Sequence, residues 1–295
     1  MPRPCLHRRR AFMGAAAGLA ALVAGSARPA ARRDAPWISA RVSTDLLDVA
    51  YYAAGPENGR PVVLVHDFGY GVDSFARLAP ILAAAGLRVL APYARGHGGT
   101  RFRDPGSPRS GQQAALGKDL IDFIDALHYP EAVFAGFGWG AHAARAASVL
   151  RPTRCVGLVL AGLGRIDESG LWERYLFQSR AGHRDLEQHP QAIARAMWSR
   201  HASGAAIDAA LFRRSAPAFA NPDFGAILAH AWGSRHAAAA PDPRYAALER
   251  RFAPGAAAAV PAILLDPASR HLPHDEPVRL ADAILNLVRK GAWRT

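Results

Sequence analysis

The feature that most constrains this chain is a glycine-rich turn between an apolar run and a helical segment. Residues 132–140 read AVFAGFGWG, and Ala132–Ala135 have the continuous apolar character of a buried strand. Gly136, Gly138 and Gly140 follow the spacing G-x-Nu-x-G of a nucleophile elbow, a sharp strand-to-helix turn that presents a reactive side chain (Nu). Position 138 should carry Ser, Cys or Asp, and it carries glycine. The sequence therefore predicts the turn without its nucleophile.

Apolar runs alternate with helical patterns from about residue 42 to residue 162. The short runs predict strands that are buried on both faces, and amphipathic segments between them predict helices, one of which restarts at Pro80. This alternation predicts an α/β fold with a mostly parallel sheet flanked by helices, preceded by one or two antiparallel strands within 42–53. The expected strands are 62–65, 88–91, 132–135 and 155–161, and the expected helices are 73–85, 110–127 and 139–150.

The pattern changes at about residue 163, after which helical segments rich in Trp, Tyr, Arg and His follow one another without a strand. We expect these segments to form a helical cap over the sheet. A strand at 261–265 and a last helix, capped by Asp275 and ended by Gly291, return the chain to the sheet. The expected cap helices are Leu171–Arg180, Ile193–Arg200, Ala209–Phe219 and Phe224–His236, and the predicted division is 1–27, 28–162, 163–255 and 256–295.

The first 27 residues have the features of an export signal. Arg8–Met13 resembles a twin-arginine motif, an Ala-rich apolar run follows to Ala24, and Gly25-Ser26-Ala27 offers a small-residue cleavage site. We expect a periplasmic or secreted protein with no stable membrane insertion once the signal is removed, because the run is too short to span a bilayer. The alternatives are an uncleaved anchor or a disordered basic tail.

The charge and composition of the chain argue against several kinds of binding partner. The whole chain has 36 basic and 24 acidic residues. Its arginines are scattered without basic blocks or interleaved aromatic residues, which argues against binding to nucleic acid. The 12 histidines show no metal-ligand spacing, and no Walker or Rossmann spacing of glycines is present. We therefore expect neither a metal nor a cofactor, and the oligomeric state stays open.

Four motifs, in order, resemble those of the α/β-hydrolase family. His66-Asp67-Phe68-Gly69 stands where that family has its H-G-x-x oxyanion motif, and residues 92–100 resemble its P-x-x-R-G-x-G loop. Gly136–Gly140 is the elbow, and residues 271–276 match the stretch that carries the catalytic His. This resemblance covers nearly all of the chain after residue 27. It implies an α/β-hydrolase sheet with a helical cap.

Within the family, Gly138-Trp139-Gly140 resembles the D-W-G elbow of epoxide hydrolases and haloalkane dehalogenases, which have an Asp nucleophile and a helical cap. The nucleophile is here replaced by glycine. The resemblance implies a tyrosine that assists epoxide opening, for which Tyr175 and Tyr245 are the candidates. It also implies a small apolar molecule bound in a pocket between sheet and cap.

The resemblance assigns the remaining site residues. The backbone N–H groups of Trp139 and Phe68 are the expected oxyanion donors, and neither depends on a side chain. Asp67 follows His66 where the family has glycine. Its carboxylate either opposes negative charge at the donors or turns away and caps a turn, and the sequence leaves both readings open.

His271 is the expected base, and His274 is then a packing or capping residue. The expected acid is Asp266, although it precedes His271 by only five residues, where the family has another strand between acid and base. Asp167 or Glu168, after the preceding strand, is the fallback.

Two functions of different class follow from these residues. The first is an exported hydrolase of small apolar esters, epoxides or halides that is weak or inactive because Gly138 holds no nucleophile. The alternative is a non-catalytic protein that binds a small molecule in the same pocket, with extra room at Gly138 for a ligand group or a water molecule.

Overall fold

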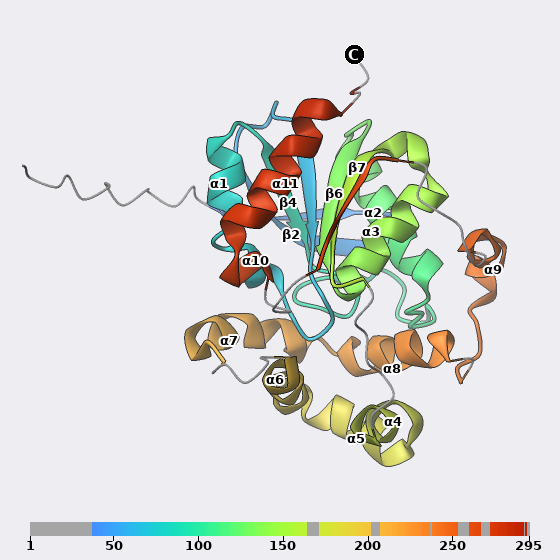
Figure 1. Ribbon diagram of the computed structural model, residues 1–295. Helices are drawn as coiled ribbons and strands as arrows, with labels where there is room; N and C mark the ends of the chain where they lie inside the picture. Colours follow the sequence, from blue (N-terminus) through green and yellow to red (C-terminus); the bar gives the residue numbers. More distant parts are fainter. Residues whose placement is uncertain are drawn as a thin grey trace, which may run out of the picture. The chain divides into compact units, whose positions relative to one another are not determined.

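The computed structural model describes residues 37–163, 171–201, 207–236, 238–252, 260–266, 272–291 and 293. Within these residues, eight strands form one sheet in the order β1-β2-β4-β3-β6-β7-β8, and β5 pairs with β2 (Figure 1). The strands are β1 (Ile38–Ser43), β2 (Leu47–Ala54), β3 (Pro61–Val65), β4 (Arg88–Pro92), β5 (Arg101–Phe102), β6 (Ala132–Phe137), β7 (Cys155–Ala161) and β8 (Ala262–Leu265).

The sheet is parallel from β4 to β8 and antiparallel at its other side. Strands β4, β3, β6, β7 and β8 are joined by parallel pairings, whereas β2 runs antiparallel to β1, β4 and β5. The expectation of a mostly parallel sheet with antiparallel strands before it is confirmed. Because parallel strands end at the same edge, the segments that follow β3, β6 and β7 meet there.

Helices cover both faces of the sheet, as the sequence predicts. Helices α2 (Gln113–Ala126) and α3 (Trp139–Leu150) pack together, and so do α1 (Ala79–Ala84) and α11 (Pro277–Lys290) (Figure 1). The predicted restart at Pro80 is confirmed, because a short 3-10 turn, η1 (Val72–Phe75), precedes α1 and Pro80 stands in the first turn of α1. Proline fits there because the first turn of a helix needs no N–H from it.

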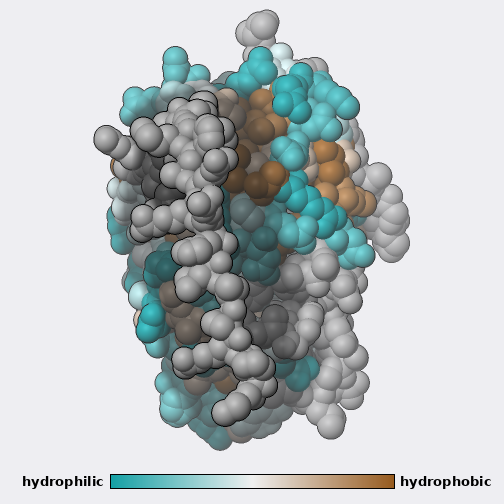
Figure 2. Space-filling view, turned by 60° about the vertical axis from the view of Figure 1, so that its left-hand side comes forward, coloured by the Kyte–Doolittle hydropathy of each residue, from teal (hydrophilic) through white to brown (hydrophobic). Residues whose placement is uncertain are grey.

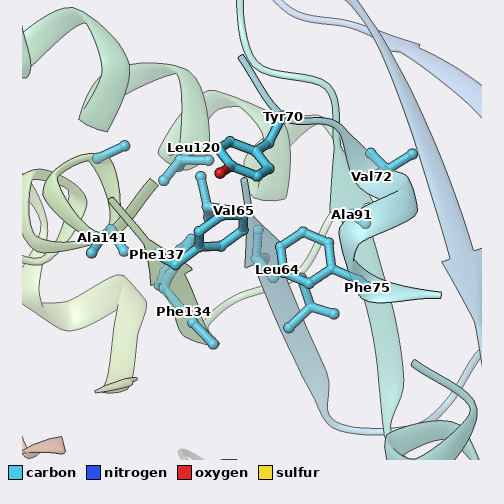
Figure 3. Close-up of a cluster of buried hydrophobic side chains, with 14 of the residues drawn as sticks. Leu64, Val65, Tyr70, Val72, Phe75, Ala91, Leu120, Phe134, Phe137 and Ala141 are labelled. Atoms are coloured by element: carbon cyan, nitrogen blue, oxygen red, sulfur yellow. The ribbon is translucent and has the colours of Figure 1, made fainter. Parts of the chain in front are cut away.

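The core lies between the sheet and these helices. Every residue of β3, β6 and β7 is buried. Aromatic rings fill the space near the carboxyl ends of β3 and β6: Tyr70 and Phe75 each meet Phe137 edge to face, with ring centroids 5.4 and 5.8 Å apart (Figure 3). This rigid packing holds the strand ends in place.

A layer of helices follows β7 in sequence and lies across one end of the sheet, below it in Figure 1. Its helices are α4 (Leu171–Gln178), α5 (Arg180–Gln188), α6 (Pro190–His201), α7 (Ala209–Ser215) and α8 (Phe224–Arg235), with the 3-10 turn η3 (Ala216–Ala220) between the last two. The predicted helical cap is therefore present. Helix α5 was not among the predicted helices, because its many charged and polar residues hide a narrow apolar face.

The segment after the helical layer departs from the sequence analysis. The turns η4 (Pro243–Tyr245) and η5 (Arg250–Phe252), with α9 (Ala246–Glu249) between them, belong to the stretch that we expected in the cap. They pack beside α2 instead, where Tyr245 clusters with Ala114 and Ala115. The reason is that Tyr245 offers its ring to the small side chains at the start of α2.

The last helix also begins differently from the prediction. Asp275 lies in the short helix α10 (Leu272–Asp275), and α11 has Glu276 at its N-cap without a side-chain hydrogen bond. The prediction that Asp275 caps this helix is therefore wrong. Proline at position 277 starts α11 instead, since its fixed φ suits the first helical position. The predicted end at Gly291 is confirmed.

In the described part of the chain, no helix has both the length and the apolar character that a membrane span requires. Figure 2 shows a face on which small groups of hydrophobic residues lie beside hydrophilic ones. The predicted export signal at 1–27 lies outside the described residues. Export therefore stays a prediction.

Candidate functional site

The predicted elbow is present at the junction of β6 and α3. Gly138 has φ +54° and ψ −125°, in a region that L side chains rarely adopt, and it forms the N-cap of α3. Its N–H donates to Ala161 O at 3.0 Å, and its carbonyl accepts from Ala141 N at 3.1 Å. A Cβ at Gly140 would overlap the backbone of Val65, so the turn needs a glycine there for close approach.

Strand register brings the elbow opposite the loop that follows β3. In the parallel pair of β3 and β6, Val65 lies beside Gly136. Two residues further along each chain stand Asp67 and Gly138. Because side chains alternate along strands, residues two positions on return to the same side. Asp67 and Gly138 thus stand at equivalent distances beyond a paired position, just past the ends of two neighbouring strands.

The carboxylate of Asp67 lies at the oxyanion donors. Its Oδ1 accepts a hydrogen bond from Phe68 N and another from Trp139 N, both at 2.8 Å. The structure therefore brings together the two backbone groups that the sequence predicts as donors. The reading in which Asp67 turns away is wrong, because backbone N–H groups attract a carboxylate strongly.

The carboxylate also occupies the space beside the glycine. A Cβ built on Gly138 would overlap Cγ and both carboxylate oxygens of Asp67. The expectation that Gly138 leaves extra room for a ligand group or water is therefore wrong. The missing side chain at one position is replaced in space by the side chain of the other.

His66 fixes the loop that carries Asp67. Its Nε2 accepts from Ala94 N at 3.1 Å, so Nδ1 carries the proton and donates to Asp67 O at 2.9 Å. Burial lowers the pKa of His66 to about 4, and the imidazole is neutral at pH 7. The neutral His66 side chain therefore holds the loop in place through its two hydrogen bonds to the backbone. It is not a base at this site, because both ring nitrogens are engaged with the backbone.

The buried ring of His97 packs against the same loop. It stacks on Phe68 with the ring planes 4° apart and their centroids 5.6 Å apart, and burial lowers the pKa of His97 well below 6.5. No sequence pattern assigns His97 a role beyond its loop. Its contact with Phe68 holds one of the two donors in position.

Trp139 joins the donors to the helical layer. Its ring packs on Phe68 at a centroid distance of 4.8 Å, and the guanidinium of Arg235 from α8 lies 4.7 Å from the ring centroid. Arg235 also approaches His142 Nε2 at 3.5 Å. Gly138 and Trp139 are both partly exposed. The elbow thus has a positively charged neighbour and the N-terminus of α3, both of which favour negative charge.

Further contacts fasten the helical layer to the loops around the site. Trp198 Nε1 in α6 donates to Gly69 O at 2.6 Å, and its ring stacks on Tyr70 with centroids 4.8 Å apart. Asn221 Nδ2, between η3 and α8, donates to Thr100 O at 2.8 Å. These contacts place the layer over the loops that follow β3 and β4. The sequence offers only the Trp content of these helices as a signal for them.

A small cavity of about 30 Å³ borders the donors. Its lining includes Phe68, Trp139 and Gly140 and, from α2, Leu120 and Phe123. Such a volume holds about one or two water molecules. A pocket for an apolar molecule between sheet and cap stays a prediction.

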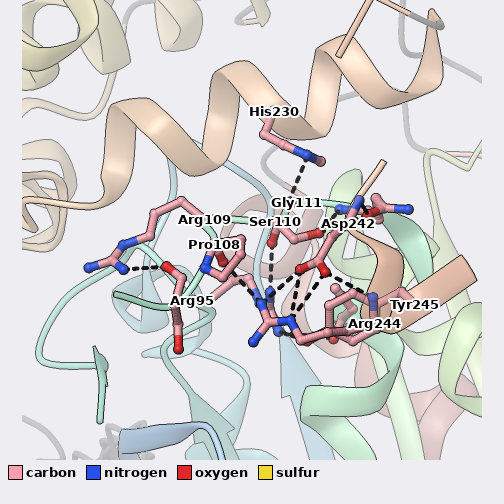
Figure 4. A network of polar contacts seen from close by, with 12 residues as sticks. Arg95, Pro108, Arg109, Ser110, Gly111, His230, Asp242, Arg244 and Tyr245 are labelled. Carbon is pink, nitrogen blue, oxygen red and sulfur yellow. Dashed lines mark hydrogen bonds and ion pairs between the residues drawn. The ribbon is translucent and has the colours of Figure 1, made fainter. Parts of the chain in front are cut away.

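A buried arginine supports the loop after β4. Arg95 donates to both carboxylate oxygens of Asp119 at 2.6 Å and to Ser110 O at 2.6 Å. Its Nη2 also reaches Tyr245 Oη at 3.3 Å, within a network that includes Asp242 (Figure 4). Arg95 thus anchors the loop after β4 to α2 and to the segment that precedes α2.

Within the described residues, neither tyrosine candidate makes a hydrogen bond or a ring contact with the elbow. Tyr175 is exposed on α4 and donates to Asp185 Oδ2 at 2.7 Å. Tyr245 is buried beside Arg95 and α2. Their hydroxyl groups are engaged in structural contacts. The role in epoxide opening that we expected for one of them is therefore not supported.

The expected base and its acids are only partly within the described residues. His271, Asp167 and Glu168 lie outside them, and Asp266 is exposed directly after β8. His274 is buried, and its Nε2 lies 3.1 Å from Asp208 Oδ2 at the start of α7. His274 therefore has the packing role that we expected. The described residues contain no cluster of three or more His, Cys, Asp or Glu side chains that could hold a metal ion.

Comparisons with known proteins agree with this architecture. Residues 62–283 match the sequence profile described as the alpha/beta hydrolase family. A solved structure from Klebsiella pneumoniae, provisionally assigned as an epoxide hydrolase, is 28% identical with a TM-score of 0.79, and the match covers 85% of this chain and 97% of that one.

Two curated relatives match shorter stretches. Epoxide hydrolase A of Mycobacterium tuberculosis is 28% identical over 141 residues, which is 48% of this chain and 43% of that protein. An epoxide hydrolase of Caballeronia sordidicola is 34% identical over 131 residues, which is 43% of this chain and 38% of that protein. The matches thus span less than half the length of each relative. The elbow, the paired donors, the parallel sheet and the profile match together show that this chain belongs to the alpha/beta hydrolase family.

Proposed function

We propose that this protein hydrolyses small apolar electrophiles, with epoxides as the first class to test and esters and halides as related classes. The observation that carries the proposal is the convergence of Phe68 N and Trp139 N on one point beside the elbow, each 2.8 Å from the oxygen held there. Two preorganised donors at one oxygen are what a developing oxyanion requires. The names of the relatives support the epoxide class.

The geometry favours catalysis over the weak or inactive protein that the sequence suggests. That expectation depends on a missing reactive group at position 138. The structure shows a carboxylate in the same space, supplied by Asp67. A protein that only binds a ligand has no need to hold both donors on a carboxylate oxygen.

Turnover assays test the proposal. The purified full chain is incubated with a panel of small aryl and alkyl epoxides, and diol formation is followed by chromatography. We expect turnover above the buffer rate. Tyr175→Phe should leave this turnover unchanged, because Tyr175 is exposed and its hydroxyl donates to Asp185. If the panel binds by calorimetry without any product, the non-catalytic binding function replaces this proposal.

Two further assignments remain proposals. His271 is proposed as the base for the hydrolytic step, on the motif match alone, and His271→Ala is expected to abolish turnover. Export is proposed on the twin-arginine-like sequence at 8–13. Fusion of residues 1–27 to a reporter that is active only after folded export tests it, with Arg8→Lys/Arg9→Lys/Arg10→Lys as the control.

A further inference from the structure

We infer that the nucleophile of this protein is Asp67, so that the reactive carboxylate comes from the loop after β3 and glycine stands at the elbow. This inference rests on the proposed hydrolytic function, and it names both the attacking residue and the class of substrate. In the pattern that the chain resembles, glycine follows the histidine after β3 and aspartate stands at the elbow. Here aspartate is at position 67 and glycine is at position 138, so the two residue types have exchanged places.

The strand register makes such an exchange possible. Asp67 and Gly138 each stand two residues beyond the paired residues Val65 and Gly136. A carboxylate can therefore reach the same point from either strand. With Asp67 in place, position 138 also has to be glycine, because a Cβ there would overlap the Asp67 carboxylate.

The hydrogen bonds orient the carboxylate for attack. Oδ1 accepts the hydrogen bonds from Phe68 N and Trp139 N, and Oδ2 accepts neither of these two hydrogen bonds. One oxygen is thus held where negative charge develops later, and the other is the attacking atom. The N-terminus of α3 and the nearby guanidinium of Arg235 favour the ionised form that attack needs.

The reaction then balances with water as the sole co-reactant. Oδ2 attacks a ring carbon of the epoxide, the ring C–O bond breaks, and the alkoxide takes a proton from water. The Asp67 side chain is now an ester whose carbonyl oxygen, Oδ1, lies on both donors. The hydroxide left from that water adds to Cγ, the Cγ–Oδ2 bond breaks, and the hydroxide proton passes to Oδ2 as the diol leaves. The carboxylate regains its second oxygen from water.

The same arrangement narrows the substrate class. Since Oδ1 already takes both donors, the carbonyl oxygen of an incoming ester finds no oxyanion stabilisation there. Displacement at a saturated carbon needs no such donors in its first step. An Asp67 nucleophile therefore narrows the proposed substrate classes to epoxides and alkyl halides and excludes the esters.

Isotope transfer tests the inference directly. The full chain turns over styrene oxide in water labelled with heavy oxygen, and the peptide that contains Asp67 is then analysed by mass spectrometry. We expect heavy oxygen in that peptide after several turnovers and not in the peptide that contains Asp266. A rapid acid quench should also reveal a styrene oxide adduct on the Asp67 peptide.

Two variants complete the test. Asp67→Asn is expected to lower turnover about a thousandfold or more, as loss of a nucleophile does, and to abolish both label and adduct. Asp67→Gly/Gly138→Asp moves the carboxylate to the other strand, and the label is expected to follow it to the peptide that contains position 138. Circular dichroism and thermal unfolding establish that both variants fold.

The outcomes separate the two proposals. An adduct on the Asp67 peptide without turnover supports the assigned nucleophile and contradicts the proposed hydrolase. Turnover with label elsewhere, or turnover that survives Asp67→Asn, leaves the hydrolase standing and overturns the assignment. Absence of both adduct and label at Asp67 also overturns it.

Discussion

The carboxylate of Asp67 occupies the space that a side chain on Gly138 would need. The two residues follow neighbouring parallel strands at equivalent distances from a paired position. They form a single structural unit that provides one carboxylate and one glycine. This relationship explains why a glycine is tolerated at the tip of the elbow. It also means that substitutions at the two positions should have non-additive effects on the free energy of unfolding.

We expect Gly138→Ala to destabilise the protein strongly. The substitution adds backbone strain at positive φ, about 1–3 kcal/mol, and overlap with Asp67, about 1–3 kcal/mol more. In an Asp67→Gly background the overlap disappears, so the cost of the alanine should fall by at least about 1 kcal/mol. Urea unfolding of the four proteins measures this coupling.

Gly86→Ala is the matched control for the backbone effect. Gly86 also has a positive φ, +84°, and a Cβ there meets nothing within 4 Å. Its substitution should cost only the strain. Equal losses at the two glycines, or strict additivity with Asp67→Gly, would contradict the overlap.

Arg95 should be among the most sensitive residues for stability. Its guanidinium is fully buried and bonded to both oxygens of Asp119, so Arg95→Met leaves a carboxylate without its partner. We expect a loss of about 3–5 kcal/mol. Arg95→Met/Asp119→Leu should recover part of it, because no unpaired charge remains. Arg154→Ala, at a more exposed ion pair with Asp125, serves as the comparison and should cost under about 1 kcal/mol.

Asp208 is expected to stabilise the start of α7 mainly through its backbone hydrogen bonds. Its Oδ1 accepts from Ala210 N and Leu211 N, both at 2.9 Å, while Oδ2 meets His274. Asp208→Ala should cost about 1 kcal/mol, and Asp208→Asn should cost less than half of that because an amide oxygen still caps the helix. Thermal unfolding that gives equal losses for both variants would show that the charge matters more than the cap.

Buried neutral histidines should make the protein sensitive to acid. Burial lowers the pKa of His66 to about 4 and that of His142 to about 3, from 6.5. Between pH 6.5 and the lowered value the unfolded chain binds a proton that the native state does not, so stability falls as the pH drops through this window. The loss from His66 alone approaches about 3 kcal/mol. Unfolding free energies measured from pH 8 to pH 4 test this.

His142→Gln isolates one contribution to that pH dependence. Glutamine does not titrate, so the variant should lose less stability than the wild type as the pH falls from 6.5 to 4. Above pH 7 the difference between the two proteins should be constant. Parallel curves over the whole range would show that His142 is not protonated on unfolding in this window.

Much of the fold could be predicted because its signals are local. Continuous apolar runs such as 62–65 and 155–161 became the central strands, and Pro80 marked the start of a helix. Other features depended on distant contacts. Tyr245 lies outside the helical cap in which we expected it, because its ring packs beside the start of α2. Asp275 is not the N-cap residue of the last helix, because Pro277 starts that helix.

The sequence by itself determined the glycine spacing of the elbow, the identity of the two donors and the absence of a side chain at 138. These properties depend on residue type and on distance along one segment. Only the tertiary structure decided what Asp67 does, because its neighbour Gly138 is 71 positions away in the chain and the two meet through the pairing of β3 with β6. A carboxylate binds where backbone N–H groups converge, and that convergence exists only once both strands lie side by side.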